Sequence, residues 1–136
     1  MSLSQIKLFK ENKMKFTTKQ IGDFGEKYTV KYLKKNGYKI LERNYLKRYG
    51  EIDIIAENKE YLVFVEVKTR NTNAIARAGE AVNFHKRRCL IKTASAYISE
   101  HNITKFCRFD VSEVYIYSDT LKIQSINYIE NAFILE

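Results

Sequence analysis

The sequence has few of the residues that build disulfide frameworks, zinc centres or histidine-based catalytic sites. It contains two cysteines, Cys89 and Cys107, and two histidines, His85 and His101, in 136 residues. No Cys–His cluster has the spacing of a zinc site, so we expect neither zinc nor a disulfide, and both cysteines to be buried, reduced thiols. A Ser-His-Asp triad has little material to draw on. Carboxylates must therefore carry any chemistry.

Long apolar runs and proline are also absent. No apolar run approaches the roughly 18 residues that span a bilayer, and no signal-type apolar block follows the Lys-rich start. We therefore expect a cytoplasmic protein with no membrane partner. A chain of 136 residues with 45% hydrophobic content is long enough to bury one real core and too short for two ordinary domains. We predict a flexible basic N-terminal arm over residues 1–16 and a single domain over residues 17–136.

Basic residues outnumber acidic ones. Lys and Arg number 24 against 16 Asp and Glu, which gives a formal net charge of +8. Such a surface attracts polyanions, so nucleic acid is the first partner to test. The alternative is a basic surface that only keeps the protein in solution. Charge alone does not separate the two readings.

Hydrophobic periodicity predicts an α/β domain with the order α-β-β-β-α-β-β and a short C-terminal helix within residues 128–135. Thr17 and Gln20 resemble a capping box, and the first helix ends at Asn36-Gly37. After a polar loop over 71–77, a second helix is expected with Glu80 in its first turn. The predicted strands cover residues 40–46, 51–56, 61–68, 106–117 and 121–126.

Acidic residues fall on the second and third predicted strands. Because side chains alternate along a strand, Glu66 and Lys68 share one face. A two-residue turn at 58–59 would place residue 53 opposite 64 and residue 51 opposite 66, and a four-residue turn keeps the same parity. Glu51, Asp53, Glu66 and Lys68 are then expected to converge on one face.

Three carboxylates on one face of an apolar hairpin require a compensating cation, because desolvation and mutual repulsion both disfavour them. Lys68 neutralises one charge. A divalent ion would neutralise two, and an all-oxygen ligand set suits magnesium or manganese. An isolated Glu-x-Lys pair is more often an exposed surface ion pair, but Asp53 on the neighbouring strand favours the metal site.

Glu26, on the first helix, is a further candidate. Gly22 and Gly25 flank it, and each costs about 0.5 to 1 kcal/mol in a helix relative to alanine. That cost suggests a close backbone approach to a neighbour. Glu26 lies off the apolar stripe of the helix and is placed to border the open face of the sheet. The alternative is a solvent-facing glutamate beside Lys27.

Several basic residues are candidates for phosphate contacts. Lys86 continues the apolar stripe of the second helix one turn toward its start, so it is expected to point toward the strand ends. Basic side chains of this kind position a nucleic-acid backbone without reading its sequence, although most charge runs are solvated faces. The candidate nucleic-acid-binding residues are Lys86, Arg70, Arg43, Arg48 and Arg87.

These motifs resemble two known groups of proteins. Asp53 followed by Glu66-Val67-Lys68 resembles the PD-(D/E)XK nuclease superfamily, with Ile52 in place of the usual proline. An ordered set of motifs over residues 17–134 resembles the YraN-like family of small bacterial proteins. The set is Gly22-x-x-Gly25-Glu26, Asn44-Tyr45, Gly50-Glu51-Ile52-Asp53, Phe64-Val65-Glu66-Val67-Lys68-Thr69-Arg70, Arg108-Phe109-Asp110 and Asn131-Ala132-Phe133.

The resemblance implies a restriction-endonuclease-like core, related to archaeal Holliday junction resolvases, with a central mixed sheet flanked by helices. It implies that Asp53, Glu66 and the Val67 carbonyl bind Mg²⁺ or Mn²⁺, that Glu26 binds the metal directly or through water, and that Lys68 is the active-site lysine. The expected activity is endonucleolytic hydrolysis of nucleic acid, with DNA, including branched DNA, as the first substrate. Related resolvases act as dimers, so a homodimer is a partner to test.

Two other readings stay open from the sequence. One is a nucleic-acid-binding protein that has the same fold but does not cut, which the basic charge supports equally well. The other is a protein-interaction scaffold in which Glu66 and Lys68 form a structural pair. Loss of the acids separates the readings, because a pure binder tolerates it while its affinity still falls steeply with salt.

Overall fold

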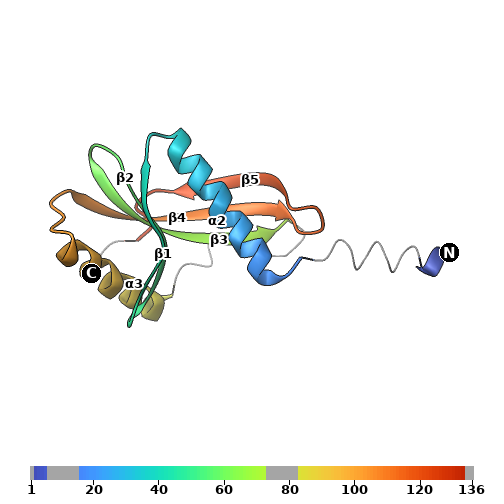
Figure 1. Ribbon diagram of the computed structural model, residues 1–136, viewed down its shortest axis with the longest axis horizontal. Helices are drawn as coiled ribbons and strands as arrows, with labels where there is room; N and C mark the ends of the chain where they lie inside the picture. Colours follow the sequence, from blue (N-terminus) through green and yellow to red (C-terminus); the bar gives the residue numbers. More distant parts are fainter. Residues whose placement is uncertain (1, 6–15, 73–82, 134–136) are drawn as a thin grey trace.

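The computed structural model describes residues 2–5, 16–72 and 83–133, and the expected basic arm lies mostly outside these ranges. The domain has the predicted α/β order (Figure 1). Its elements are α2 (Thr18–Lys35), β1 (Lys39–Lys47), β2 (Gly50–Glu57), β3 (Tyr61–Asn71), α3 (Phe84–Glu100), β4 (Phe106–Tyr117) and β5 (Lys122–Ile129). Among the described residues, no helix is long and apolar enough to cross a membrane.

The strands form one mixed five-stranded sheet in the order β1-β2-β3-β4-β5. Neighbouring strands are antiparallel except β3 and β4, which run parallel. Parallel neighbours need a crossover connection, and the segment containing α3 supplies it. The predicted central mixed sheet with flanking helices is therefore confirmed.

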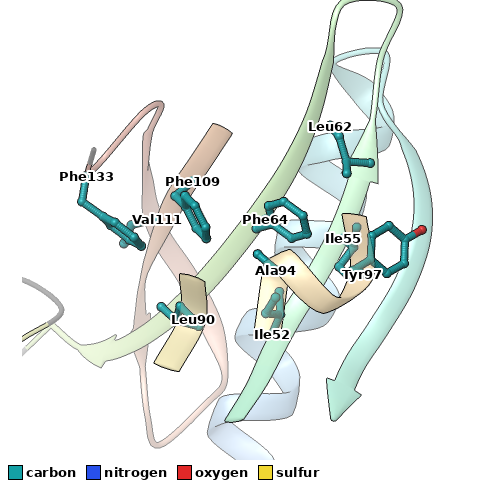
Figure 2. Close-up of a cluster of buried hydrophobic side chains, with 10 residues drawn as sticks. All are labelled: Ile52, Ile55, Leu62, Phe64, Leu90, Ala94, Tyr97, Phe109, Val111 and Phe133. Carbon is teal, nitrogen blue, oxygen red and sulfur yellow. The ribbon is translucent and has the colours of Figure 1, made fainter. Parts of the chain in front are cut away.

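The two helices cover opposite faces of the sheet, and each face has its own apolar core. Leu33 of α2 packs with Ile54 and Val65. On the other face, Leu90 of α3 belongs to a larger cluster that includes Phe64. Figure 2 shows this cluster, with the rings of Phe64, Phe109 and Phe133 lined up across the strands and side chains of α3 against them. Strands buried on both faces explain the continuous apolar run in β3.

The helix starts show one prediction confirmed and one corrected. Thr17 Oγ1 accepts from the Gln20 N–H at 3.1 Å, and Gln20 Oε1 accepts from the Thr17 N–H at 2.8 Å, so the predicted capping box is present. In contrast, α3 begins at Phe84 with Asn83 as its cap and has no acid in its first turn. The expected role of Glu80 there is wrong, and Glu80 itself, with residues 73–77 of the predicted loop, lies outside the described residues.

The predicted C-terminal helix is wrong for the residues that the structure describes. Tyr128 and Ile129 belong to β5, and residues 130–133 form a turn instead of a helix. Asn131 has a φ of 50°, a left-handed conformation that stops strand and helix alike, and its N–H donates to Asp110 Oδ1 at 2.9 Å. Phe133 still packs into the core as expected. Residues 134–135 lie outside the described ranges.

The prediction that both cysteines are buried is wrong, because neither side chain is fully buried. Cys89 is half-buried, and Cys107 is exposed. Cys107 is accessible because the first residues of β4 line an open hollow together with Tyr61 and Glu130. Both cysteines are free, as expected.

Candidate functional site

The strands β2 and β3 separate where the predicted acids lie. Their antiparallel pairing runs from Glu57–Leu62 to Ile54–Val65, after which β2 stays paired with β1 and β3 with β4. Asp53 and Glu66 are the first residues beyond the last pair, at the base of this fork. Four residues, 58–61, separate the paired Glu57 and Leu62, so the register, continued past Ile54–Val65, would place residue 53 opposite 66 instead of 64. The expected convergence of Glu51, Asp53, Glu66 and Lys68 on one face is wrong, because Glu51 and Asp53 line a hollow on the α2 side, whereas Glu66 pairs with Lys86 of α3.

Asp53 lies where the alternation of β2 is broken. Ile52 and Ile55 face α3, whereas Ile54 faces α2, so the regular two-residue period fails between 52 and 54. Across the fork, the Val67 N–H donates to Asp53 Oδ2 at 2.8 Å. This hydrogen bond ties the carboxylate of one strand to the backbone of the other.

Glu66 faces α3 and is 8% exposed. The ammonium group of Lys86 forms an ion pair with Glu66 Oε1. Lys86 lies in the first turn of α3, where its own N–H donates to the Asn83 side chain at 2.9 Å. A cation is disfavoured near a helix N-terminus, so the carboxylate of Glu66 offsets an otherwise unfavourable position. The expectation that Lys86 points toward the strand ends is confirmed.

Glu26 reaches the fork because α2 packs very closely on β3. A Cβ on Gly25 would lie 1.8 Å from Thr69 Oγ1, so only glycine permits this approach. The close approach inferred from the flanking glycines is thus confirmed for Gly25. It is wrong for Gly22, which has no described atom within 4 Å of where its Cβ would be. Glu26 also lies 4.0 Å from the Arg43 guanidinium.

The fork carries more negative charge than its hydrogen bonds compensate. Burial, together with the negative charges of Glu66, Glu26 and Glu51, raises the pKa of Asp53 to about 8, although the hydrogen bond from the Val67 N–H lowers it. Burial likewise raises the pKa of Glu26, which the nearby Arg43 charge opposes. These shifts mark a negative potential that a cation would relieve.

Lys68 lies on the α3 side of the fork, two residues after Glu66 on the same face of β3. Burial lowers its pKa, and so do the positive charges of Arg70 and Lys86. In the parallel register Lys68 stands beside Glu113 of β4. Its ammonium group is therefore surrounded by charges of both signs close to the acids.

An open hollow of about 740 Å³ lies beside Asp53 on the α2 side of the fork. The carboxylates of Glu26, Glu51 and Asp53 line it, together with the cationic side chains of Lys19 and Arg43. A hollow lined by both carboxylates and cationic side chains suits a ligand that carries both metal ions and phosphate groups.

The donor set fits a magnesium-type ion that keeps most of its water. Within residues 16–72 and 83–133, no three His, Cys, Asp or Glu side chains form a ready-made metal cage. Magnesium rarely needs one, because it is commonly held by one or two carboxylates, with water and substrate phosphates as the remaining ligands. Asp53 and Glu66 supply two carboxylates from neighbouring strands, and the pKa of Asp53 is raised by burial and then by the negative charge of Glu66.

Comparison with known proteins places the chain in a family. The model of the uncharacterised protein family UPF0102 matches residues 25–114. A UPF0102 protein of Caldanaerobacter subterraneus is 45% identical over 120 residues, which cover 88% of this chain and 98% of that protein. A UPF0102 protein of Clostridioides difficile is 47% identical over 116 residues, 85% and 97% of the two chains. The chain belongs to the UPF0102 family. The resemblance to the YraN-like proteins is thereby confirmed.

The UPF0102 match extends from Gly25 in α2 to Val114 in β4, so it includes every acid at the fork. It also includes Arg108 and Asp110, which the structure places away from the fork. Arg108 Nε donates to Asp110 Oδ1 at 2.8 Å, and Asp110 is fully buried. This pair holds β4 to the chain end through the Asn131 N–H. The Arg-Phe-Asp motif thus supports the fold.

The predicted basic residues of this UPF0102 chain do not all gather at the fork. Lys86 and Arg43 contact its acids directly. Arg70 lies near Lys68, whose pKa its charge lowers. Arg87 lies over the Phe133 ring at 5.6 Å, and Arg48 is an exposed residue of the β1–β2 turn. The periodicity of a helix or strand does not predict which of these basic residues reach the fork, because that depends on what packs against each helix or strand.

Sequence reasoning missed a buried polar group beside Lys68. Glu113 is 4% exposed and accepts from Tyr115 Oη at 3.2 Å and from Asn127 Nδ2 at 3.1 Å. An acid in the apolar run of β4 was a detectable signal, since such residues are rarely buried without partners. The pairing with Lys68 was not detectable, because it follows from the parallel register of β3 and β4.

Proposed function

We propose that this UPF0102 protein is a metal-dependent endonuclease that hydrolyses phosphodiester bonds in nucleic acid, with DNA as the first substrate. The observation that carries the proposal is the fork, where Asp53 and Glu66 stand first beyond the last pair of β2 and β3. The buried carboxylate of Glu66, the half-buried carboxylate of Asp53 with its raised pKa, Lys68 and an acid from α2 form a set that stability alone does not require.

The chain's own residues have distinct roles in this mechanism. Asp53, Glu66 and the Val67 carbonyl would hold magnesium or manganese, and Glu26 would contact the ion directly or through water. Such an ion, when bound, lowers the pKa of a coordinated water and offsets the charge of the phosphate. Lys68 donates a hydrogen bond to the attacking water or to a phosphoryl oxygen.

Lys86 and Arg43 are placed to receive the phosphate backbone, because each already lies against an acid of the fork. The water oxygen bonds to phosphorus in line with the departing group, and the bond from phosphorus to the 3′ oxygen breaks. The 3′ oxygen takes up a proton, and a 5′ phosphate remains on the other product. Phosphate contacts of this kind fix the position of the strand without reading its sequence.

A second candidate function is nucleic-acid binding without cleavage. The ion pair between Lys86 and Glu66 favours it, because the lysine occupies one oxygen of a carboxylate that the metal would need. The two candidates differ in whether the acids matter once nucleic acid is bound.

The test compares isosteric variants on branched, flapped and linear DNA and on RNA, with magnesium or manganese. We expect Asp53→Asn and Glu66→Gln each to lower the cleavage rate on the order of a hundredfold or more, since a bound metal supplies several kcal/mol of transition-state stabilisation. Glu60→Gln, an exposed acid in the β2–β3 loop, is the matched control and should cut normally. Undiminished cleavage by both fork variants would refute the mechanism, and binding without any cleavage by the wild type would favour the second candidate.

A further inference from the structure

The turn between β1 and β2 packs against α3. A Cβ on Gly50 would lie 3.4 Å from Thr93 Oγ1 and 3.6 Å from Cys89 Cβ, so the hairpin end and the helix are in contact. Figure 1 shows this end of the β1–β2 hairpin beside the first turns of α3. The contact brings Tyr49, the residue before Gly50, to the helix surface. It lies at the same end of the sheet as the fork.

Two exposed aromatic rings with cations over them continue along this surface. Phe84 is 69% exposed, and Tyr49 is 50% exposed. Arg88 Cζ lies 5.8 Å from the centre of the Phe84 ring, and Lys92 Nζ lies 5.8 Å from the centre of the Tyr49 ring. Residues 84, 88 and 92 recur every four positions, so they share one face of α3. We name Tyr49, Phe84, Arg88 and Lys92 the aromatic–basic stripe.

The stripe lies on the opposite side of α3 from the core. Leu90, Ala94 and Tyr97 face the sheet, so the stripe is not needed to bury the helix. Large apolar rings left in water are disfavoured, and a protein of net charge +8 has many other residues for its surface. Exposed aromatic rings beside cationic side chains suit a polyanion whose aromatic groups are free to stack on those rings.

A single strand of nucleic acid has that chemistry and a paired duplex does not. Proteins hold single strands with aromatic rings that stack on bases and cations that follow the phosphates, whereas the bases of a duplex already stack on one another. From residue 84 to residue 92 the helix rises about 12 Å. That length matches three or four stacked nucleotides at about 3.4 Å each.

We propose that the aromatic–basic stripe binds an unpaired segment of nucleic acid, with bases stacked on Tyr49 and Phe84 and phosphates held by Arg88 and Lys92. The inference rests on the proposed nuclease function and narrows its substrate to nucleic acid with a single-stranded part, such as a flap, a fork or a branch. Phe84 lies two residues before Lys86, which contacts Glu66. A strand leaving the fork over the start of α3 therefore reaches the stripe.

The test measures binding without metal, so that cleavage does not enter. Fluorescence anisotropy with labelled oligothymidylate and with a blunt duplex, both in EDTA, gives two dissociation constants. We expect Tyr49→Ala and Phe84→Ala each to weaken binding of the single strand about tenfold, in the range for loss of one stacked base, and to change duplex binding little. Tyr49→Phe keeps the ring and should retain the wild-type affinity.

Phe106→Ala is the matched control, because Phe106 is 80% exposed but lies at the start of β4, beside Tyr61 at the far end of the sheet from the fork. Unchanged single-strand affinity in both stripe variants, or an equal loss in Phe106→Ala, would overturn the inference. A dimer seen by sedimentation and lost in the stripe variants, with oligothymidylate binding intact, would assign the stripe to a second copy of the chain instead. The outcome is separable from the nuclease proposal, which fails if Asp53→Asn and Glu66→Gln cut normally or if the wild type binds nucleic acid without cutting it.

Discussion

Asp110 and Asp53 are both carboxylates within the sheet, yet their surroundings are opposite. Asp110 is fully buried and accepts from Arg108 Nε and Nη2, each at 2.8 Å. It also accepts from Tyr128 Oη at 2.6 Å and from the Asn131 N–H at 2.9 Å. Each of its oxygens therefore accepts two hydrogen bonds, and a buried cation balances its charge. Those contacts with Asp110 raise the pKa of Arg108.

Among the described residues, Asp53 has three other acids near it and no cation paired with it as Arg108 is with Asp110. The Val67 N–H donates to it, but Glu66, Glu26 and Glu51 all raise its pKa, which with burial reaches about 8. Lys86 pairs with Glu66 and Arg43 lies near Glu26, each from a partly exposed position. The difference indicates that the carboxylate that stabilises the fold has a full set of hydrogen bonds and a paired cation. The carboxylate at which we expect a ligand has neither.

Removing the charge of Asp110 tests most strongly whether this carboxylate stabilises the fold. We expect Asp110→Asn to lower the free energy of unfolding by about 3 to 5 kcal/mol, because Arg108 would be left with its charge uncompensated. Urea denaturation followed by circular dichroism measures this. Glu130→Gln is the control, since Glu130 is exposed and lies 3.8 Å from Arg108, and it should change little. A loss under about 1 kcal/mol in Asp110→Asn would contradict the structural role.

Substitutions at two glycines of α2 test whether the close packing of α2 on β3 positions Glu26 at the fork. Gly25→Ala should lower the free energy of unfolding by about 1 to 3 kcal/mol, because its Cβ would overlap Thr69 and push α2 away from β3. Gly22→Ala meets no described atom within 4 Å and should stabilise the protein by about 0.5 to 1 kcal/mol. Equal effects of both substitutions in thermal unfolding would show that Glu26 is not positioned in this way.

Removing the charge of Asp53 should raise the free energy of unfolding, whereas removing the charge of Asp110 should lower it. The pKa of Asp53 rises from 3.8 to about 8 in the folded, metal-free protein. The folded state therefore holds a proton that the unfolded state releases, and stability present below pH 3.8 is lost as pH rises toward about 8. Asp53→Asn cannot ionise, so at pH 9 it should be about 1 to 2 kcal/mol more stable than the wild type.

The same pair of proteins provides the control for Asp53. The difference in free energy of unfolding should vanish near pH 4 and should shrink or reverse when manganese is added at pH 9, because the ion supplies the missing positive charge. Denaturation in EDTA and in manganese at both pH values checks this. A wild type that stays the more stable protein at pH 9 in EDTA would disagree with the charge imbalance at the fork.

Lys86 should prove replaceable where Arg108 is not. If the lysine and a metal ion compete for Glu66, Lys86→Gln should tighten manganese binding several-fold, about 1 kcal/mol, and change stability little. Isothermal titration with manganese measures it. Lys105→Gln is the matched control, because Lys105 forms a similar pair with Glu57, 2.9 Å long, away from the fork. Weaker manganese binding in Lys86→Gln would mean that the lysine supports the metal site instead.

The elements set by local pattern were predictable. Thr17 and Gln20 formed the capping box that their spacing indicates, and β4 has the predicted bounds, Phe106 to Tyr117. The presence of acids on the neighbouring strands β2 and β3 was also predictable, but their faces were not, because the alternation of β2 is broken between Ile52 and Ile54. The turn at residues 130–133 was not predictable from local pattern, because long-range hydrogen bonds from the Asn131 N–H to Asp110 and from the Ala132 N–H to the Phe109 carbonyl hold it.

By itself, the sequence determined the α/β order, the basic charge and the presence of acids on β2 and β3, since each depends on residue type and on a period of a few residues. Only the tertiary structure decided that β2 and β3 part after Ile54–Val65 and that α2 reaches Thr69 through Gly25. It also separated Asp110, whose charge Arg108 balances, from Asp53, which has no paired cation in the part of the chain that the structure describes. Local periodicity cannot carry that information, because the partners of a buried charge come from segments far apart in the chain.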